Sequence, residues 1–200
     1  MKKQHPHRRA RAHIDEPRFS MLVRAIEGND PALSPEWAAE ALGKARRGVR
    51  YLCKIVASRD PSQPRLAAVY GLASAELRSA EVNLLLRVFQ DTSENPATRG
   101  QAAEALAGRI RFDSSQGPLR RRDVVGRFAL LRGLGDPAPE VRFWSIFALA
   151  QRGNDWVVPQ LETMRDDDAV IPRMWTVGQE AQWAINRISG GDPARDPSSF

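Results

Sequence analysis

Cysteine and histidine are scarce in this chain of 200 residues, and their scarcity excludes several kinds of site. The single cysteine, Cys53, excludes an internal disulfide, and its place in an apolar run favours a small buried side chain. All three histidines, His5, His7 and His13, lie in the first thirteen residues. A Ser-His-Asp or Cys-His catalytic arrangement is therefore excluded from the rest of the chain.

Long apolar runs and glycine-rich phosphate loops are also absent from the sequence. No stretch approaches the roughly 18 consecutive apolar residues that a membrane-spanning helix needs. The basic start of the chain is not followed by the apolar segment of a secretory signal. We therefore expect a cytoplasmic protein without a membrane partner, and we predict no catalytic residue, no metal ion and no cofactor.

Positive charge is unevenly distributed along the sequence. The formal net charge is +6, and arginine supplies 26 of the 30 basic residues. Residues 1–13 carry five basic residues and no acid, whereas residues 136–200 carry six basic and ten acidic residues. We expect residues 1–13 to form a disordered basic tail and residues 192–200 a polar tail, because neither segment has apolar periodicity.

Apolar residues recur with helical spacing through the rest of the chain, and prolines and glycines fall between the periodic segments. Ser34 followed by Pro35 is a strong helix start, because serine caps a helix and proline suits its first position. Further helices are predicted near residues 18–27, 47–58, 63–74, 79–90, 96–108, 119–134, 138–151, 155–165 and 176–188. The sequence therefore predicts an all-α fold.

One five-residue motif occurs five times. Its copies are Ala38–Leu42, Ala68–Leu72, Ala102–Leu106, Ser145–Leu149 and Ala181–Ile185. The last residues of successive copies lie 30, 34, 43 and 36 residues apart. Repeats of this period are typical of stacked helical pairs, whose continuous surface usually holds a partner. We therefore predict an α-solenoid of about five helical hairpins over residues 14–191.

The fourth helical pair carries the most characteristic residues. They are Asp136-Pro137, Glu140-Val141-Arg142, Ala148-Leu149, Gly153, Val158-Pro159, Leu161 and Met164. This pattern resembles a HEAT repeat, in particular the short bacterial kind related to phycobilisome-lyase repeats. That family places an aspartate in the turn and an arginine about six residues later, as Asp136 and Arg142 are placed here.

The preceding pairs carry matching residues. They are Asp60, Arg65, Asn95 and Arg99. The resemblance implies that a charge-assisted hydrogen bond from each arginine to the neighbouring turn fixes the stacking register. The acidic run Asp166–Asp168 lacks the spacing of a calcium loop, and we expect it to hold the turn aspartate of the last repeat.

The resemblance covers about residues 30–188 and implies a binding or scaffolding role. The first and last copies have Pro35 and Gly178 in place of the arginine, as atypical capping repeats do. We therefore expect a non-catalytic protein–protein interaction or scaffold module. Two alternatives stay open. The first is a nucleic-acid-binding protein, and the second is a HEAT-like enzyme, either a glycosylase for alkylated DNA bases or a chromophore lyase.

Aromatic residues concentrate in the fourth pair and the last helix. Phe143 and Phe147 share a helix face, Trp144 lies beside them, and Trp183 has the place of Phe147 in the next copy. An exposed cluster of this kind would be a partner-binding surface. The same face could instead be covered by residues 169–175, by the C-terminal tail or by another subunit.

Arginines gather in and after an enlarged loop at about residues 108–119. They are Arg109, Arg111, Arg120, Arg121, Arg122 and Arg127. Helix energetics do not explain three consecutive arginines at a helix start, because the helix dipole disfavours cations there. This basic patch could bind phosphate or an acidic protein, or it could be a solvated loop. In a nucleic-acid-binding protein, the basic tail and Lys44–Lys54 would act with it.

Overall fold

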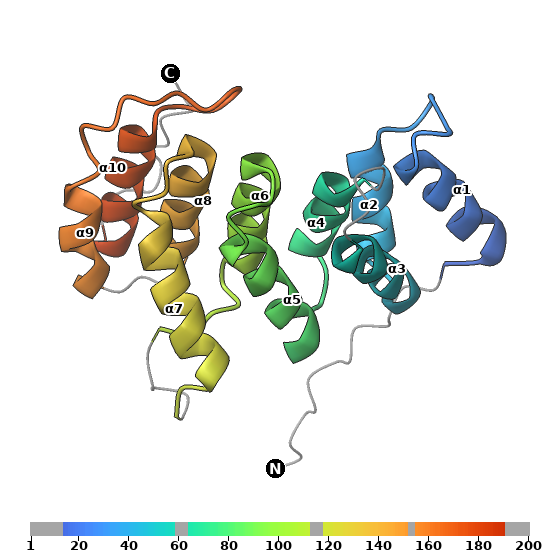
Figure 1. Cartoon of the computed structure of the whole chain (residues 1–200), viewed down its shortest axis with the longest axis horizontal. Helices are drawn as coiled ribbons and strands as arrows, with labels where there is room; N and C mark the ends of the chain where they lie inside the picture. Colours follow the sequence, from blue (N-terminus) through green and yellow to red (C-terminus); the bar gives the residue numbers. More distant parts are fainter. Residues whose placement is uncertain (1–13, 59–63, 113–117, 152–154, 191–200) are drawn as a thin grey trace, which may run out of the picture. The chain divides into compact units, whose positions relative to one another are not determined.

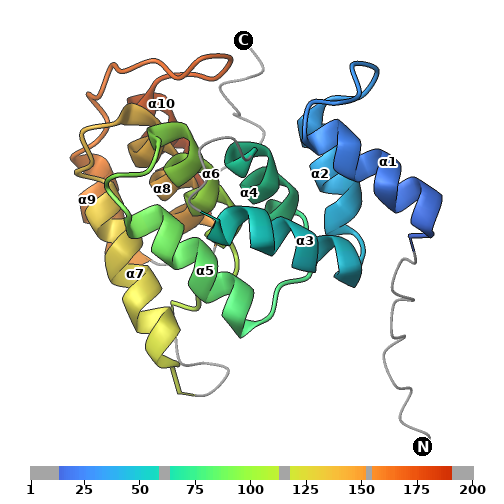
Figure 2. The ribbon, with the colours of Figure 1, turned by 45° about the vertical axis from the view of Figure 1, so that its right-hand side comes forward.

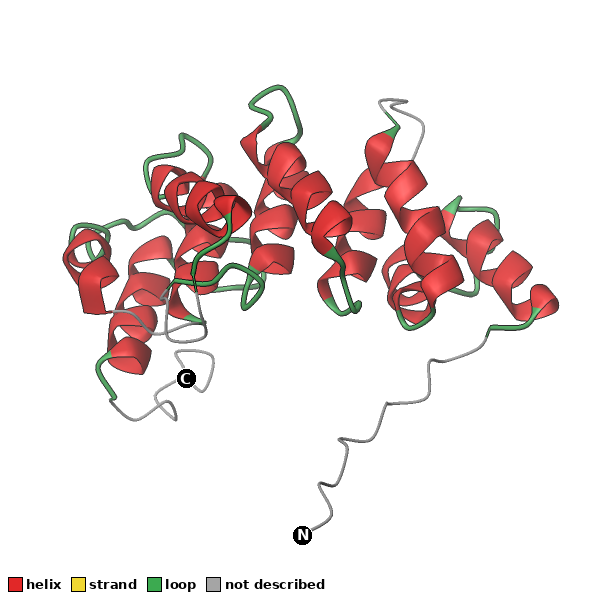
Figure 3. Ribbon diagram, turned by 90° about the horizontal axis from the view of Figure 1, so that it is seen from below, coloured by secondary structure: helices red, strands yellow, loops and turns green. Residues whose placement is uncertain are grey.

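A computed structural model describes residues 14–58, 64–112, 118–151 and 155–190. These residues form ten α-helices and one 3-10 helix, η1 (Figure 1). The described residues contain no strand beyond an isolated bridge between Val170 and Thr176, and loops and turns join the helices (Figure 3). The all-α prediction is confirmed.

The chain divides into two compact units, Met1–Glu76 (unit 1) and Leu77–Phe200 (unit 2). Unit 1 contains α1 (Glu16–Ile26), α2 (Pro35–Gly43), α3 (Arg46–Ala57) and α4 (Arg65–Ala73). Unit 2 contains α5 (Ser79–Gln90), α6 (Pro96–Leu106), α7 (Arg121–Gly133), α8 (Pro139–Ala150), η1 (Asp155–Val157), α9 (Val158–Glu162) and α10 (Val177–Ile188). Most predicted helices agree with these bounds to within two residues at each end. The exception is the segment predicted over 155–165, which is split into η1 and a short α9.

Local capping chemistry explains where several helices begin. The Ser34 hydroxyl accepts a hydrogen bond from the Trp37 N–H at 3.1 Å, and Pro35 is the first residue of α2. The Asn95 side chain accepts a hydrogen bond from the Ala97 N–H at 2.9 Å at the start of α6. Such side chains satisfy N–H groups that have no partner inside the helix, so these boundaries are visible in the sequence.

Neighbouring helices pack in sequence order within each unit, as in an α-solenoid. In unit 2, α6 packs against α8 and α8 against α10, while α5 packs against α6 and beside α7 (Figures 1 and 2). In unit 1, α2 packs against α1, α3 and α4. The motif copies therefore lie in helices that pack against one another, namely α2 and α4 in unit 1 and α6, α8 and α10 in unit 2.

Small residues of the motif helices allow close helix packing. A Cβ atom added at Gly71 would lie 2.4 Å from the carbonyl oxygen of Ala39, and one added at Gly43 would lie 2.2 Å from that of Gly71. The residues that close the motif copies in unit 1, Leu42 and Leu72, are fully buried. The motif helices thus have small residues where they contact one another and one large side chain in the core.

Some predictions fall on residues that the structure does not describe. These are the basic tail of residues 1–13, Asp60 and the C-terminal tail of residues 192–200. The prediction of one solenoid domain over residues 14–191 stays a prediction.

Candidate interaction surfaces of unit 2

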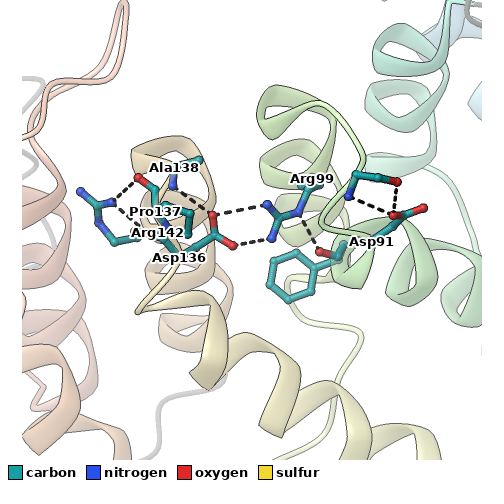
Figure 4. Close-up of polar contacts among 8 residues, drawn as sticks. Asp91, Arg99, Asp136, Pro137, Ala138 and Arg142 are labelled. Carbon is teal, nitrogen blue, oxygen red and sulfur yellow. Dashed lines mark hydrogen bonds and ion pairs between the residues drawn. The ribbon is translucent and has the colours of Figure 1, made fainter.

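An ion pair joins two successive repeats of unit 2. Arg99 in α6 points to the carboxylate of Asp136, in the turn before α8 (Figure 4). Its Nη1 atom lies 3.4 Å from Oδ1 of Asp136, and its Nε donates to the carbonyl oxygen of Phe89 at 3.2 Å. The two charged side chains are only 8% and 9% exposed. Arg99 therefore links the end of α5 to the turn of the next repeat.

The same contact recurs one repeat later. Nε and Nη2 of Arg142 donate to the two carboxylate oxygens of Asp167 at 2.7 and 3.1 Å. Nη1 of Arg142 donates to the main-chain oxygen of Asp136 at 2.9 Å. Burial raises the pKa of Asp167, but hydrogen bonds from Arg142 and from the Ala169 N–H outweigh burial and hold this pKa below its ordinary value.

The remaining stacking residues take different places. Arg65 donates to the carbonyl oxygen of Val56 at 3.1 Å, near the end of α3. Asn95 caps α6 instead of bonding its turn. In that turn Asp91 accepts a hydrogen bond from the Ser93 N–H, as Asp136 does from the Ala138 N–H. Asp91 was not among the predicted stacking residues, although Asp91, Asp136 and Asp167 each accept a hydrogen bond from the N–H of a small residue two positions later. That spacing is the signal that could have found Asp91.

Phe143 does not belong to an exposed surface. It is fully buried, and its ring packs against Trp144 at a centroid distance of 5.2 Å and against Trp175 at 6.0 Å. Trp175 comes from residues 169–175, the segment expected as an alternative cover of this face. A buried ring offers no area to a partner, and of the other three predicted aromatics Phe143 contacts Trp144.

The other three aromatics form a continuous row, which we call the aromatic ladder: Trp144, Phe147 and Trp183. All three are half-buried. Trp144 meets Phe147 edge-on at 5.5 Å, and Phe147 stacks on Trp183 at 5.9 Å with an interplanar angle of 11°. The guanidinium of Arg187 lies 5.4 Å from the Trp183 ring centre, within cation–π distance. The ladder therefore ends in a positive charge.

Glu104 occupies on α6 the motif position that Phe147 and Trp183 occupy on α8 and α10. Burial raises the pKa of Glu104, against the lowering effects of a hydrogen bond from Gln101 and the charge of Arg109. A carboxyl group with a raised pKa can serve acid–base chemistry.

A metal site is a separate question. The described residues hold no group of three histidine, cysteine or acidic side chains suited to a metal ion.

The predicted basic patch does not form one open surface. Arg122 donates to the Ser79 hydroxyl, and Arg109 donates to the carbonyl oxygen of Ala105 at 2.7 Å. Arg127 lies over the ring of Trp156 at 4.9 Å and over that of Phe112 at 5.9 Å. Arg111 is half-buried, whereas Arg120 and Arg121 are exposed. Half of the patch is thus engaged inside unit 2.

The outer face of α7 carries apolar residues that were not among the predicted site residues. Phe128 is 65% exposed, and Val124 and Val125 are 39% and 38% exposed. Arg121 and Arg132 are exposed on the same helix face. The sequence spacing indicates this face, because Val124, Val125, Phe128 and Arg132 follow Arg121 by three, four, seven and eleven positions. In a helix these spacings place all five side chains on one face.

A cavity of about 340 Å³ lies at the carboxyl ends of α5 and α7. Its lining includes Gln90, Thr92, Arg99, Arg132 and Asp136. Arg99 and Asp136 are paired with each other there, whereas Arg132 belongs also to the outer face of α7. The cavity thus has a mixed polar and apolar lining, and it shares Arg132 with the outer face of α7.

Similarity to known proteins does not identify these surfaces. Neither a protein-family model nor a curated protein matches the chain. Among the helices described, none has both the length and the apolar character that crossing a membrane requires.

Proposed function

We propose that this chain is a non-catalytic protein–protein interaction or scaffold module built on HEAT-like repeats. The observation that carries the proposal is the aromatic ladder. Rings that already pack against one another on two helices offer apolar area to a partner at a small cost in side-chain entropy. Aromatic side chains with an arginine at the edge are also the usual anchors of protein interfaces.

The stacking contacts support this proposal. The pairs Arg99–Asp136 and Arg142–Asp167 connect the repeats that contain α6, α8 and α10. Fixed repeats hold the ladder in one geometry before a partner arrives, which lowers the ordering cost of binding. The repetition of one contact in two consecutive turns is also what the resemblance to HEAT repeats implies.

A capture experiment tests the role of the ladder. The full chain is used to capture proteins from the native cell extract with and without nuclease, and captured proteins are identified by mass spectrometry. We expect a protein that survives nuclease treatment and is lost with the Phe147→Ala/Trp183→Ala variant. The control is Tyr70→Ala, which removes an exposed ring at the same motif position in unit 1.

The outcomes separate the candidate functions. Equal capture by wild type and by the folded double variant would show that the ladder is structural, and the proposal would lose its basis. Loss of all capture after nuclease would favour nucleic acid, the second candidate. That candidate is favoured by α3 in unit 1, which contains four basic residues and no acid, with Arg50 and Lys54 exposed.

A further inference from the structure

The outer face of α7 combines apolar and basic side chains in a regular order. Arg121 is followed by Val124, Val125 and Phe128, and then by Arg132. Eleven residues separate the two arginines, so the row extends over about 16 Å at 1.5 Å per residue. The apolar side chains therefore occupy its middle and the cations occupy its two ends.

The fold of unit 2 gives no reason for Phe128 or Arg121. The opposite side of α7 makes the contacts with the unit, through Asp123, Gly126, Ala129, Leu130 and Gly133, which are all buried. A phenylalanine that is 65% exposed adds little to that packing. Cations in the first turn of a helix are electrostatically unfavourable. An exposed phenylalanine and a cation in the first helical turn, both unfavourable for the isolated fold, therefore lie together on the outer face of α7.

The charge of this face is of one sign. The only acid in α7 is Asp123, and it is fully buried. Its carboxylate accepts hydrogen bonds from the N–H groups of Arg120 at 3.1 Å and Arg111 at 3.4 Å. The charges that α7 displays on its surface are thus those of arginine alone, including Arg121 and Arg132.

We propose that the outer face of α7 docks an acidic amphipathic helix of a partner protein. Such a helix would place apolar side chains on Val124, Val125 and Phe128 and carboxylates on the arginines at the two ends. Apolar anchors supply most of the affinity of such interfaces, and flanking charges set orientation and partner choice. This surface is separate from the aromatic ladder, so the inference goes beyond the proposed function and either can fail without the other.

The middle of the face distinguishes a protein partner from nucleic acid. Phe128 has a ring on which a base could stack, but Val124 and Val125 have neither a ring nor a group that hydrogen-bonds phosphate. Two of the three apolar residues therefore suit a protein partner better than nucleic acid. Arg132 also lines the cavity at the ends of α5 and α7, together with Gln90 and Thr92. Those two residues add hydrogen-bonding groups beside the cation that would receive an acidic side chain.

Binding of defined probes to the full chain tests this proposal. The first probe is a fluorescent synthetic peptide of about five helical turns, with leucines spaced i, i+3, i+4 and i+7 and glutamates flanking them. A second peptide has lysine in place of glutamate, and a third has the first composition with its leucines distributed around the helix. A DNA duplex of similar length is the fourth probe, and fluorescence anisotropy gives each dissociation constant.

We expect the acidic amphipathic peptide to bind in the micromolar range and more tightly than the other three probes. Phe128→Ala should weaken it about tenfold or more, as the loss of an interface anchor does. Arg121→Glu/Arg132→Glu should reverse the preference between the acidic and the lysine peptide. The matched controls, Val170→Ala at 66% exposure and Arg87→Glu on the exposed side of α5, should bind as wild type does.

Three results would overturn the inference. One is equal affinity for the amphipathic and the redistributed peptide, and another is unchanged affinity in folded Phe128→Ala. The third is preferential binding of DNA that depends on the arginines and on salt but not on Phe128, which would assign the face to nucleic acid. Binding of the acidic peptide by Phe147→Ala/Trp183→Ala would show that the α7 face acts independently of the ladder.

Discussion

Single residues in unit 2 hold one repeat on the next by charge. Arg99 and Asp136 are almost completely buried, and each also bonds main-chain atoms of its surroundings. Burying two charges costs desolvation energy, so such a pair specifies a geometry more reliably than it adds stability. We therefore propose that these contacts set the register of the helices, and so the places of the side chains of α6, α8 and α10 on the surface.

The contribution of the Arg142–Asp167 pair to stability is measurable through its dependence on pH. The pKa of Asp167 is held below its ordinary value of 3.8, so the folded state binds this proton less readily than the unfolded state does. The pair therefore stabilises the fold above pH 3.8, and this contribution is lost as pH falls through the lower folded pKa. In Arg142→Gln, Asp167 stays part-buried but loses the hydrogen bonds and the charge of Arg142. We therefore expect its pKa to rise above the ordinary value.

We expect Arg142→Gln to lower the free energy of unfolding by about 2–4 kcal/mol at neutral pH, since it leaves a part-buried carboxylate without its partner. The difference from wild type should shrink as pH falls, first through the raised pKa of Asp167 in the variant and then through its lowered pKa in wild type. Urea unfolding at a series of pH values measures both effects. Arg165→Gln, which breaks an exposed pair with Glu162, should cost less than about 1 kcal/mol. A difference that is constant with pH would assign the effect to packing.

At the scale of the helix, small residues set the distance between neighbours. Gly71→Ala places a methyl group against the carbonyl oxygen of Ala39, a main-chain atom that cannot rotate away. We expect α2 and α4 to separate, at a cost of about 1–3 kcal/mol in the free energy of unfolding. Gly135→Ala is the control, because its nearest neighbour lies at 3.8 Å. Equal thermal stability of the two variants would show that α2 and α4 are not tightly packed.

Helices were predictable from the sequence to the extent that their signals are local. Serine at 34 and asparagine at 95 mark helix starts through bonds to residues two or three positions away. The segment over 155–165 was predicted too long because Pro159 has no N–H to give a helical hydrogen bond. The chain there forms the 3-10 helix η1 and the short α9 instead.

The surfaces were less predictable because distant residues decide them. Phe143 has the spacing of an exposed aromatic, but Trp175, 32 positions later, covers it. Arg122 is engaged by Ser79, which is 43 positions away. Periodicity along one helix shows which side chains share a face and is silent on what packs against that face, so Phe128 was overlooked and Phe143 was chosen.

At the scale of the whole molecule, the described helices belong to two compact units, whereas the sequence predicts one domain over residues 14–191. In a helical array each repeat contacts only its neighbours, so stability is divided among local terms. We therefore expect Leu52→Ala, which empties a fully buried site in α3, to cost about 2–5 kcal/mol and to act locally. Hydrogen exchange should accelerate in the amides of α1–α4, while those of α6, α8 and α10 keep their protection.

The reciprocal variant is Ile146→Ala, which removes a fully buried side chain from α8. It should accelerate exchange in unit 2 and leave α2 and α3 protected, because its cavity lies among the helices of unit 2. Acceleration of both units by either variant would mean that the chain opens as one cooperative domain. In that case a partner bound to the ladder or to α7 would stabilise unit 1 as strongly as unit 2. If the units open separately, the bound partner would slow hydrogen exchange in unit 2 alone.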